Sequence, residues 1–377
     1  MAIKVQGNFN LPPVSGIQAD KQYEYRIACA QVLPSENGVK GEGGLDKLEQ
    51  YAKEAAKHEA DVIVFPEYFL TGATHDSWHA VRDTYAGNSP QSPIDPDDDP
   101  EHFLSLIGDI AKKNDIDIVA GTVVELGSHH IPHRNEEPND DDDENETDKE
   151  HDQKLFNTVY YITRSGEIAG RYTKRRLWHP ERSVLSPGHE LRHEAPRTFE
   201  ITTRNGKKLS AGIAVCWDLA FPETFREMFD LPPSSHSSKA PLIGPDVVFA
   251  PTCWYATDAG KKGLRWNPES EAALLDSICL TRAIENECVL AMTNIAGPPC
   301  PPDKDPNSLS EDDAIGVGRT CVCAPFAGCV GRVESGDETL LLAALDLRIL
   351  QDARDIYRVR HDLRSAWSTE QAKVDSR

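Results

Sequence analysis

Val62-Ile63-Val64-Phe65-Pro66-Glu67 is the stretch that first indicates the fold. Its run of apolar residues favours a short, fully buried strand, and the proline ends that strand. Upstream, small and aliphatic residues recur at helical spacing, at Leu45, Leu48, Ala52, Ala55 and Ala56. A buried strand that follows an amphipathic helix is typical of an α/β protein.

The alternation of strand and helix patterns continues along the chain. We predict strands at 25–32, 62–65, 116–124, 155–163, 167–174, 208–215, 246–250, 288–293, 320–323, 328–333 and 340–345, the last three closing a sheet. Helices are predicted at 45–56, 103–111, 222–229 and 270–287. We therefore expect an irregular N-terminal arm (1–24), one domain (25–365) with polar insertions at 128–153, 232–245 and 297–313, and a tail (366–377).

Charge and cysteine content restrict the classes of partner and compartment. The formal net charge is −22, and the segment from Glu136 to Asp152 contributes eleven acidic residues and one lysine. An acidic surface repels nucleic acid and anionic membranes, so neither is an expected partner. The nine cysteines form no CxxC pair, and no secretory signal or run of about 20 apolar residues is present. These features predict a reduced, cytoplasmic protein.

The insertion at 128–153 combines carboxylates with His129, His130, His133 and His151. Such crowding is chemically compatible with divalent metals. The residues follow no fixed ligand spacing, however, and few apolar side chains anchor them. We interpret the segment as a solvated insertion and predict no metal site.

Three residues with useful chemistry stand where predicted strands end. Cys216 follows an apolar strand and precedes a helix, whose N-terminus would favour the thiolate. Glu67 follows a buried strand, where partial desolvation would raise its pKa and suit a general base. Lys174 ends a hairpin strand and could stabilise an oxyanion. Taken singly, each is equally compatible with a structural role, as a core thiol, a turn carboxylate or a surface base.

Taken together, these segments resemble a known family. Phe65-Pro66-Glu67, Tyr172-Thr173-Lys174 and Gly212-Ile213-Ala214-Val215-Cys216-Trp217-Asp218 resemble the ordered Glu, Lys and Cys blocks of the nitrilase superfamily of carbon–nitrogen hydrolases. Lys174 with Glu181-Arg182 and Gly188 resembles the corresponding block of true nitrilases. Arg282-Ala283-Ile284-Glu285-Asn286 with Asn294 resembles a further segment. The resemblance extends from about Tyr25 to Arg364.

The resemblance implies an α/β fold of the αββα sandwich type, with four layers on dimerisation, and a homodimer or higher homo-oligomer. It implies that Cys216 is a nucleophile that forms a thioester, that Glu67 is the base and later the acid, and that Lys174 holds the oxyanion. Glu181 would position the substrate or Lys174, and no metal or organic cofactor would be needed. Four aromatic residues are candidate walls of the substrate pocket: Tyr68, Trp217, Trp254 and Tyr255.

The sequence leaves the bond that is cleaved open. Cys216-Trp217 resembles nitrilases, whereas Asp218 and Phe221-Pro222-Glu223 resemble the amidase branches, although Ala220 stands where those usually have Arg. We favour a small carboxamide as substrate, with a nitrile or an N-carbamoyl compound as alternatives. A catalytically silent scaffold is a further alternative, and the intact Glu67, Lys174 and Cys216 set argues against it. A Cys–His protease is disfavoured because nothing pairs His179 or His189 with Cys216.

Overall fold

The computed structural model describes residues 2–11, 13–34, 44–86, 103–127, 154–191, 195–229, 243–299, 309 and 313–364. The insertion at 128–153 and the tail at 366–377 lie outside these ranges, as do most residues of the insertions at 232–245 and 297–313. None of the described helices combines the length and apolar character that a membrane span requires.

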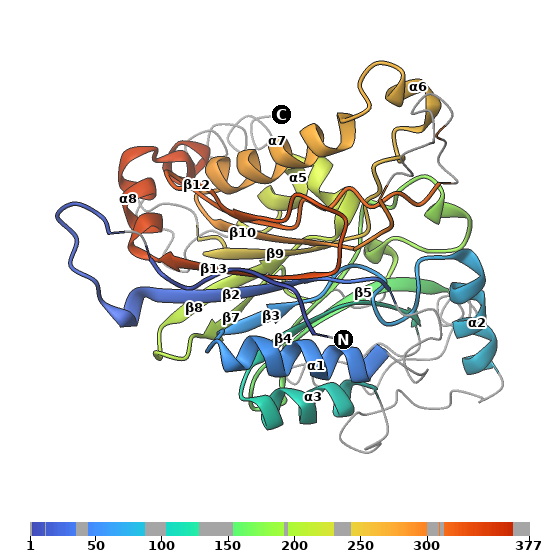
Figure 1. The fold of residues 1–377 in the computed structure, drawn as a ribbon, viewed down its shortest axis with the longest axis horizontal. Coiled ribbons are helices and arrows are strands. Elements are labelled where there is room, and N and C mark those ends of the chain that lie inside the picture. Colours follow the sequence, from blue (N-terminus) through green and yellow to red (C-terminus); the bar gives the residue numbers. More distant parts are fainter. Residues whose placement is uncertain are drawn as a thin grey trace, which may run out of the picture.

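Two sheets form the centre of the molecule (Figure 1). The first has the order β1-β13-β2-β3-β4-β5-β6, with bounds Val5–Gly7, Thr339–Asp346, Glu24–Gln31, Val62–Val64, Asp117–Leu126, Leu155–Ile162 and Ile168–Thr173. The second has the order β12-β11-β10-β9-β8-β7, with bounds Gly328–Arg332, Cys321–Ala324, Val289–Asn294, Val247–Thr252, Lys208–Ile213 and Thr198–Thr202.

Helices cover the outer faces of the two sheets (Figure 1). α1 (Gly44–Lys57) and α3 (Phe103–Asn114) pack on the first sheet, and α5 (Pro222–Arg226) and α7 (Ser270–Glu285) lie on the side of the second. The other helices are α2 (His75–Ala86), α6 (Gly260–Leu264) and α8 (Arg348–Ile356). The layers are therefore α, β, β and α, which confirms the predicted sandwich. All four layers lie within one chain.

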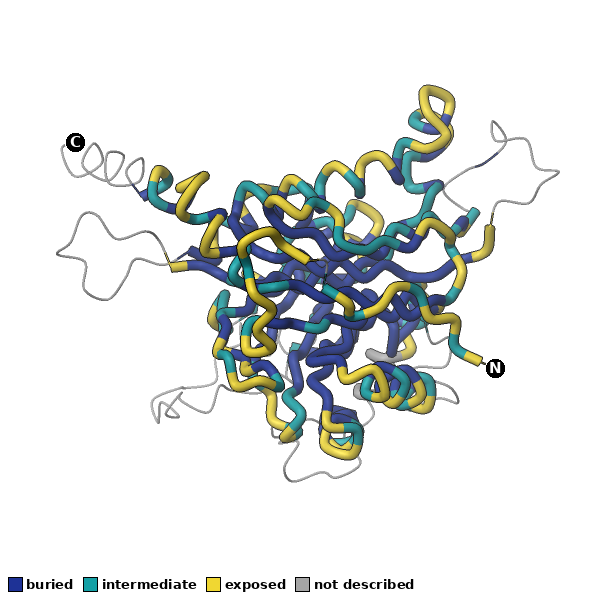
Figure 2. Tube along the Cα trace, turned by 60° about the vertical axis from the view of Figure 1, so that its left-hand side comes forward, coloured by how far each residue is buried: buried dark blue, intermediate teal, exposed yellow. Residues whose placement is uncertain are grey.

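Successive side chains of β2 and β3 point alternately to two different cores, and this holds the layers together. Ile27 and Cys29, with Val62 and Val64, belong to the core between the two sheets. Their neighbours in sequence, among them Ala28 and Ile63, belong instead to the core beneath α1 and α3. Successive side chains of a strand point to opposite faces, so an unbroken apolar run fits a strand that is covered on both sides. Figure 2 shows this buried interior enclosed by exposed helices and turns.

Two expectations about the fold are wrong. The N-terminal arm is not wholly irregular, because β1 pairs in parallel with β13 at the edge of the first sheet. The strand predicted at 340–345 does not close a sheet with 320–323 and 328–333, because β13 pairs with β2 along eight residue positions. Elements α2, β7 and α8 were not predicted. α2 is rich in polar residues, whereas β7 and α8 carry short periodic patterns of apolar residues that were not recognised.

Candidate active site

The loop after β3 places Glu67 at the mouth of the first sheet. β4 carries a register shift between Val119 and Thr122, and Gly121 within it has a φ of +74°. A Cβ atom at Gly121 would lie 2.2 Å from the carbonyl oxygen of Pro66, so only glycine allows this close approach. The hydroxyl of Thr122 accepts a hydrogen bond from the backbone N–H of Tyr68 at 2.8 Å. These contacts fix Glu67, which is completely buried.

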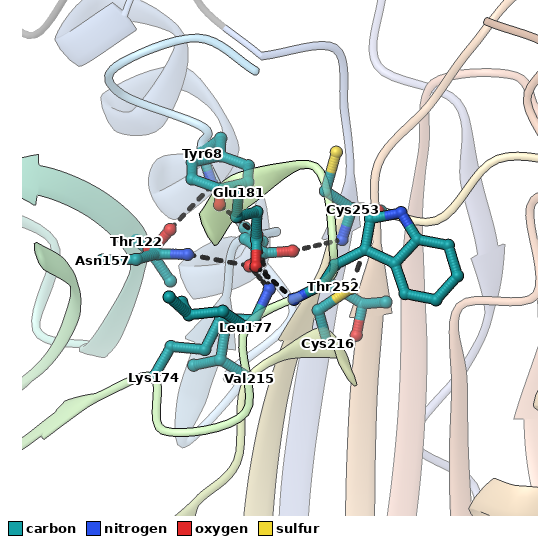
Figure 3. Close-up of polar contacts among 12 residues, drawn as sticks. Tyr68, Thr122, Asn157, Lys174, Leu177, Glu181, Val215, Cys216, Thr252 and Cys253 are labelled. Atoms are coloured by element: carbon teal, nitrogen blue, oxygen red, sulfur yellow. Dashed lines mark hydrogen bonds and ion pairs between the residues drawn. The ribbon is translucent and has the colours of Figure 1, made fainter. Parts of the chain in front are cut away.

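Lys174 is placed by the hairpin of β5 and β6. Its backbone N–H donates to the carbonyl of Asn157 at 2.9 Å, and its side chain is fully buried. The ammonium Nζ donates to Oε1 of Glu67 at 2.8 Å and to Oε1 of Glu181 at 2.6 Å. Glu181 also accepts hydrogen bonds from the hydroxyl of Tyr68 and, at 2.6 Å, from the backbone N–H of Trp178. One ammonium is thus shared by two buried carboxylates (Figure 3).

Cys216 begins a short 3-10 turn that follows β8 after Ala214 and Val215, and it has a φ of +45°. Asp218 holds this turn, because its carboxylate accepts from the backbone N–H of Val215 at 3.0 Å and from the hydroxyl of Tyr172 at 2.9 Å. It also accepts from the backbone N–H of Arg176 at 2.9 Å. Asp218 therefore ties the turn of Cys216 to the segment that follows Lys174. A left-handed conformation at a non-glycine residue is strained and is maintained only by such surrounding contacts.

Glu67 and Cys216 meet at the segment after β9. The backbone N–H of Cys253 donates to Oε2 of Glu67 at 3.0 Å, and Sγ of Cys216 lies 3.6 Å from the carbonyl oxygen of Cys253. The Cys216 thiol also interacts with the Glu67 carboxylate. Asn157 donates from Nδ2 to Oε1 of Glu67 at 2.8 Å, while its own Oδ1 is buried without a hydrogen-bond partner. The residues predicted from separate segments are thus brought together.

Burial dominates the ionisation of the site. It raises the pKa of Glu67 to about 7, in the direction that the sequence indicated, against the lowering effect of Lys174. Burial lowers the pKa of Lys174, but the carboxylates of Glu181 and Glu67 outweigh it and raise that pKa well above its usual value. Burial, followed by Glu67, also raises the pKa of Cys216. This direction is opposite to the one expected from a helix N-terminus that favours the thiolate.

The four aromatic candidates occupy different environments. Tyr68 is buried against Trp78, with ring centroids 4.8 Å apart, and its hydroxyl is engaged by Glu181. Trp217 is half-buried between Trp178 and Trp254, at centroid distances of 4.3 and 5.6 Å. Trp254 is buried, and its indole N–H donates to Glu271. Tyr255 is half-buried. Trp217 and Tyr255 are thus the two candidates that combine partial exposure with closeness in sequence to Cys216 or Cys253.

Sequence reasoning missed Asn157, Cys253 and Trp178. A polar residue within the apolar run of β5 was the available signal for Asn157. The other two lie in loops whose course no periodicity predicts.

The segment of Arg282 and Asn294, which also resembles the family, supports the loops around the site. Nε of Arg282 donates to the carbonyl of Leu219 at 3.0 Å. Asn294 holds the backbone of Trp254 through Oδ1 and Nδ2. Across the described ranges, no group of three His, Cys, Asp or Glu side chains is arranged to bind a metal ion.

Comparison with known proteins decides the family. Residues 26–230, which include Glu67, Lys174, Glu181 and Cys216, match the family model described as carbon-nitrogen hydrolase. The chain belongs to the carbon–nitrogen hydrolase family. As a member of it, the protein is an enzyme of the amidase and nitrilase type and acts on small molecules.

Individual relatives agree with this membership. A 2-oxoglutaramate amidase of Bacillus subtilis is 27% identical over 351 residues, which cover 90% of this chain and 98% of that one. A solved structure from Saccharomyces cerevisiae, a member of branch 10 of the nitrilase superfamily, has a TM-score of 0.58 at 19% identity and covers 88% of this chain and 93% of its own. An amidase mutant from Nesterenkonia sp. AN1 has a TM-score of 0.53 at 20% identity, covering 91% and 97%, and carries the acetamide moiety of fluoroacetamide on its active-site cysteine. The nitrilase-superfamily fold is thereby confirmed for this carbon–nitrogen hydrolase.

Proposed function

We propose that this enzyme hydrolyses a small carboxamide to the acid and ammonia through a thioester on Cys216. The observation that carries the proposal is the buried arrangement in which Lys174 lies between Glu67 and Glu181 while Cys216 contacts Glu67. A neutral thiol needs a base before it can attack, and a carboxylate with a pKa of about 7 is suited to accept that proton near neutral pH. The four residues thus combine nucleophile, base, cation and supporting carboxylate.

In acylation, Sγ of Cys216 attacks the amide carbon while Glu67 takes the thiol proton. The carbonyl oxygen becomes an oxyanion, which the ammonium of Lys174 stabilises. Glu67 then returns the proton to the amide nitrogen, the C–N bond breaks, and ammonia leaves behind a Cys216 thioester. In deacylation Glu67 removes a proton from water, the hydroxide adds to the thioester carbon, and the proton returns to sulfur as the acid departs.

The contacts of Glu181 support a positioning role in this reaction. Its carboxylate is saturated by Lys174, Tyr68 and the backbone of Trp178. Those contacts hold Nζ of Lys174 beside Glu67. Because the pKa of Lys174 is raised, the ammonium keeps its charge. A cation that stays charged and fixed is what oxyanion stabilisation requires.

An amide is favoured over a nitrile by the segment that flanks the nucleophile. Asp218, which resembles the amidase branches, is fully buried and holds the turn of Cys216 to the backbone of Arg176. A relative that matches nearly full length at 27% identity is named a 2-oxoglutaramate amidase, whereas a relative named nitrilase, from Pyrococcus abyssi, matches over a similar length at 21% identity. The spacing of Lys174 and Glu181-Arg182 supports the alternative, a nitrilase, because it resembles that branch.

The test offers matched amides and nitriles that share one acyl group and measures ammonia release. Amides should have the higher kcat/KM in each pair, and N-carbamoyl compounds should be slower. Nitriles that are consistently faster, with the acid as main product, would replace the amidase proposal with the nitrilase alternative. Fluoroacetamide followed by peptide mapping tests the nucleophile, since the adduct should lie on Cys216. An adduct on Cys253 instead would remove Cys216 from this role.

A further inference from the structure

Four cysteines lie together at the β12 edge of the second sheet, outside the site described above. Cys321 and Cys323 are on β11, Cys329 is on β12, and Cys279 is on α7, which covers these strands. The sulfur atoms of Cys321 and Cys323 are 3.9 Å apart, and the Cys321 thiol interacts with those of Cys279 and Cys329 as well. We refer to these four residues as the thiol cluster.

The four thiols of the cluster differ in their exposure to solvent. Cys329 is exposed, whereas Cys279, Cys321 and Cys323 are buried. Hydrogen bonds from the thiols of Cys321 and Cys323, together with the charge of Arg332, lower the pKa of Cys329. An exposed thiol with thiolate character is the form that reacts with oxidants and electrophiles, and buried thiols beside it are shielded from direct attack.

The strand register selects the partner of Cys329. Cys323 and Cys329 are register partners in the antiparallel pair of β11 and β12, directly after a register shift between Val322 and Cys323. Opposite residues of such a pair have Cα atoms about 4.5 to 5.5 Å apart, within the range of about 4.4 to 6.8 Å found for disulfides. Cys321 and Cys323 are two positions apart on one strand, where the Cα separation is about 6.8 Å and the side chains are parallel. The cross-strand pair is therefore favoured over the pair within β11.

We propose that the thiol cluster is an oxidative modification site, at which hydrogen peroxide converts Cys323 and Cys329 into a reversible cross-strand disulfide. The Cys329 thiolate attacks one peroxide oxygen, the O–O bond breaks, and sulfenic acid forms as hydroxide leaves. The sulfur of Cys323 then attacks the sulfenic sulfur, the S–O bond breaks, and the thiol proton leaves with hydroxide as water. Two thiols lose two electrons in total, and one molecule of peroxide is reduced to two of water.

The local sequence makes the bond straightforward to map. Trypsin releases Thr320–Arg332, which contains three of the four cysteines, and chymotrypsin cuts this peptide after Phe326, between Cys323 and Cys329. The reduced full-length protein is treated with hydrogen peroxide, its remaining thiols are alkylated, and both proteases are applied. We expect residues 320–326 and 327–332 to stay joined until a reductant is added. Separate peptides, with Cys329 alkylated or carrying sulfinic acid, would overturn the proposal.

Variants identify each role. Cys329→Ser, at an exposed position, should remove the joined peptides. Cys323→Ala should leave a sulfenic acid on Cys329 that dimedone labels, while Cys321→Ala and the buried control Cys288→Ala should leave the joined peptides unchanged. Joined peptides that survive in Cys323→Ala but are lost in Cys321→Ala would assign the bond to Cys321 and overturn the proposed pairing. Cys216→Ala should form the same bond, since the modification is independent of the proposed hydrolysis.

Discussion

Asp61 and Glu67 flank the same short strand, β3, yet their surroundings differ in kind. Asp61 accepts from the backbone N–H groups of Arg26 at 2.8 Å and Arg204 at 2.6 Å, and both arginine side chains reach the surface. Glu67 shares the single buried ammonium of Lys174 with Glu181. Burial raises the pKa of both carboxyls, but Asp61 has two backbone donors and the charges of Arg164 and Arg204 nearby, whereas Glu67 and Glu181 are two carboxylates that share one cation.

The difference separates a structural carboxylate from a reactive one. Asp61 joins the start of β3 to Arg26 on β2 and to Arg204 in the turn between β7 and β8, so loss of its carboxylate should weaken the fold. Around Glu67 the charge is incompletely balanced, and the unpaired Oδ1 of Asn157 adds another acceptor. Such a site favours a proton or a developing charge, and perturbed pKa values of this kind are typical of functional sites. The following predictions test that contrast.

The largest effect is expected for Cys216→Ala. Loss of the nucleophile removes the covalent route, so amide turnover should fall by several orders of magnitude. Thermal unfolding should change little, because the substitution removes one small buried atom. Ammonia release and the unfolding midpoint are compared with wild type. Turnover above about a tenth of the wild-type rate would exclude Cys216 as the nucleophile.

Glu67→Gln and Asp61→Asn form a matched pair at the two ends of β3. Gln keeps the shape of Glu67 but cannot accept a proton, so kcat should fall by about 10²–10⁴. Asp61→Asn should leave kcat within about twofold and lower the unfolding free energy by about 1–3 kcal/mol, because a buried acceptor of backbone N–H groups is lost. Steady-state kinetics and denaturant unfolding measure both. An Asp61→Asn enzyme that is stable but inactive would contradict the structural role of Asp61.

The pH dependence should follow Glu67. Its pKa of about 7 means that the carboxyl is mostly protonated below that pH, where it cannot accept the thiol proton. We therefore expect kcat/KM to fall as the pH decreases through about 7. Asn157→Ala removes a donor to the ionised carboxylate, so the midpoint should move upward by about one pH unit. Thr158→Ala, on the same strand with its hydroxyl bonded to Thr173, is the control and should leave the midpoint unchanged. An unmoved midpoint in Asn157→Ala would show that Asn157 does not tune Glu67.

Apolar runs in the sequence predicted most strands, and the resemblance to the nitrilase superfamily predicted the association of Glu67, Lys174 and Cys216. It did not predict the pairing of β13 with β2, since long-range register leaves no mark in local periodicity. It also could not predict the contacts of Asn157 and Cys253, which depend on how two sheets face each other. Oligomeric assembly, the cytoplasmic location and the roles of Tyr255 and Trp217 stay predictions.

The smallest effect is expected for Tyr68→Phe. The Tyr68 hydroxyl donates to Glu181, and burial, then Glu181, raises its pKa, so the phenol stays neutral and remains a donor throughout the working range. Phenylalanine keeps the ring contact with Trp78 and removes only this donor. Glu181 retains Lys174 and the backbone N–H of Trp178, so Lys174 should stay nearly in place.

We therefore expect kcat of Tyr68→Phe to fall by about threefold to tenfold, which corresponds to about 0.7–1.4 kcal/mol in the barrier, while KM for a small amide changes little. Trp78→Phe is the matched control, because it alters the ring contact but not the hydrogen bond. A rise in KM with kcat unchanged would mean that Tyr68 contacts the substrate itself, as its sequence position suggested, and that Glu181 does not depend on it. Steady-state kinetics on one amide series separates these outcomes, because a positioning role acts on kcat and a binding role on KM.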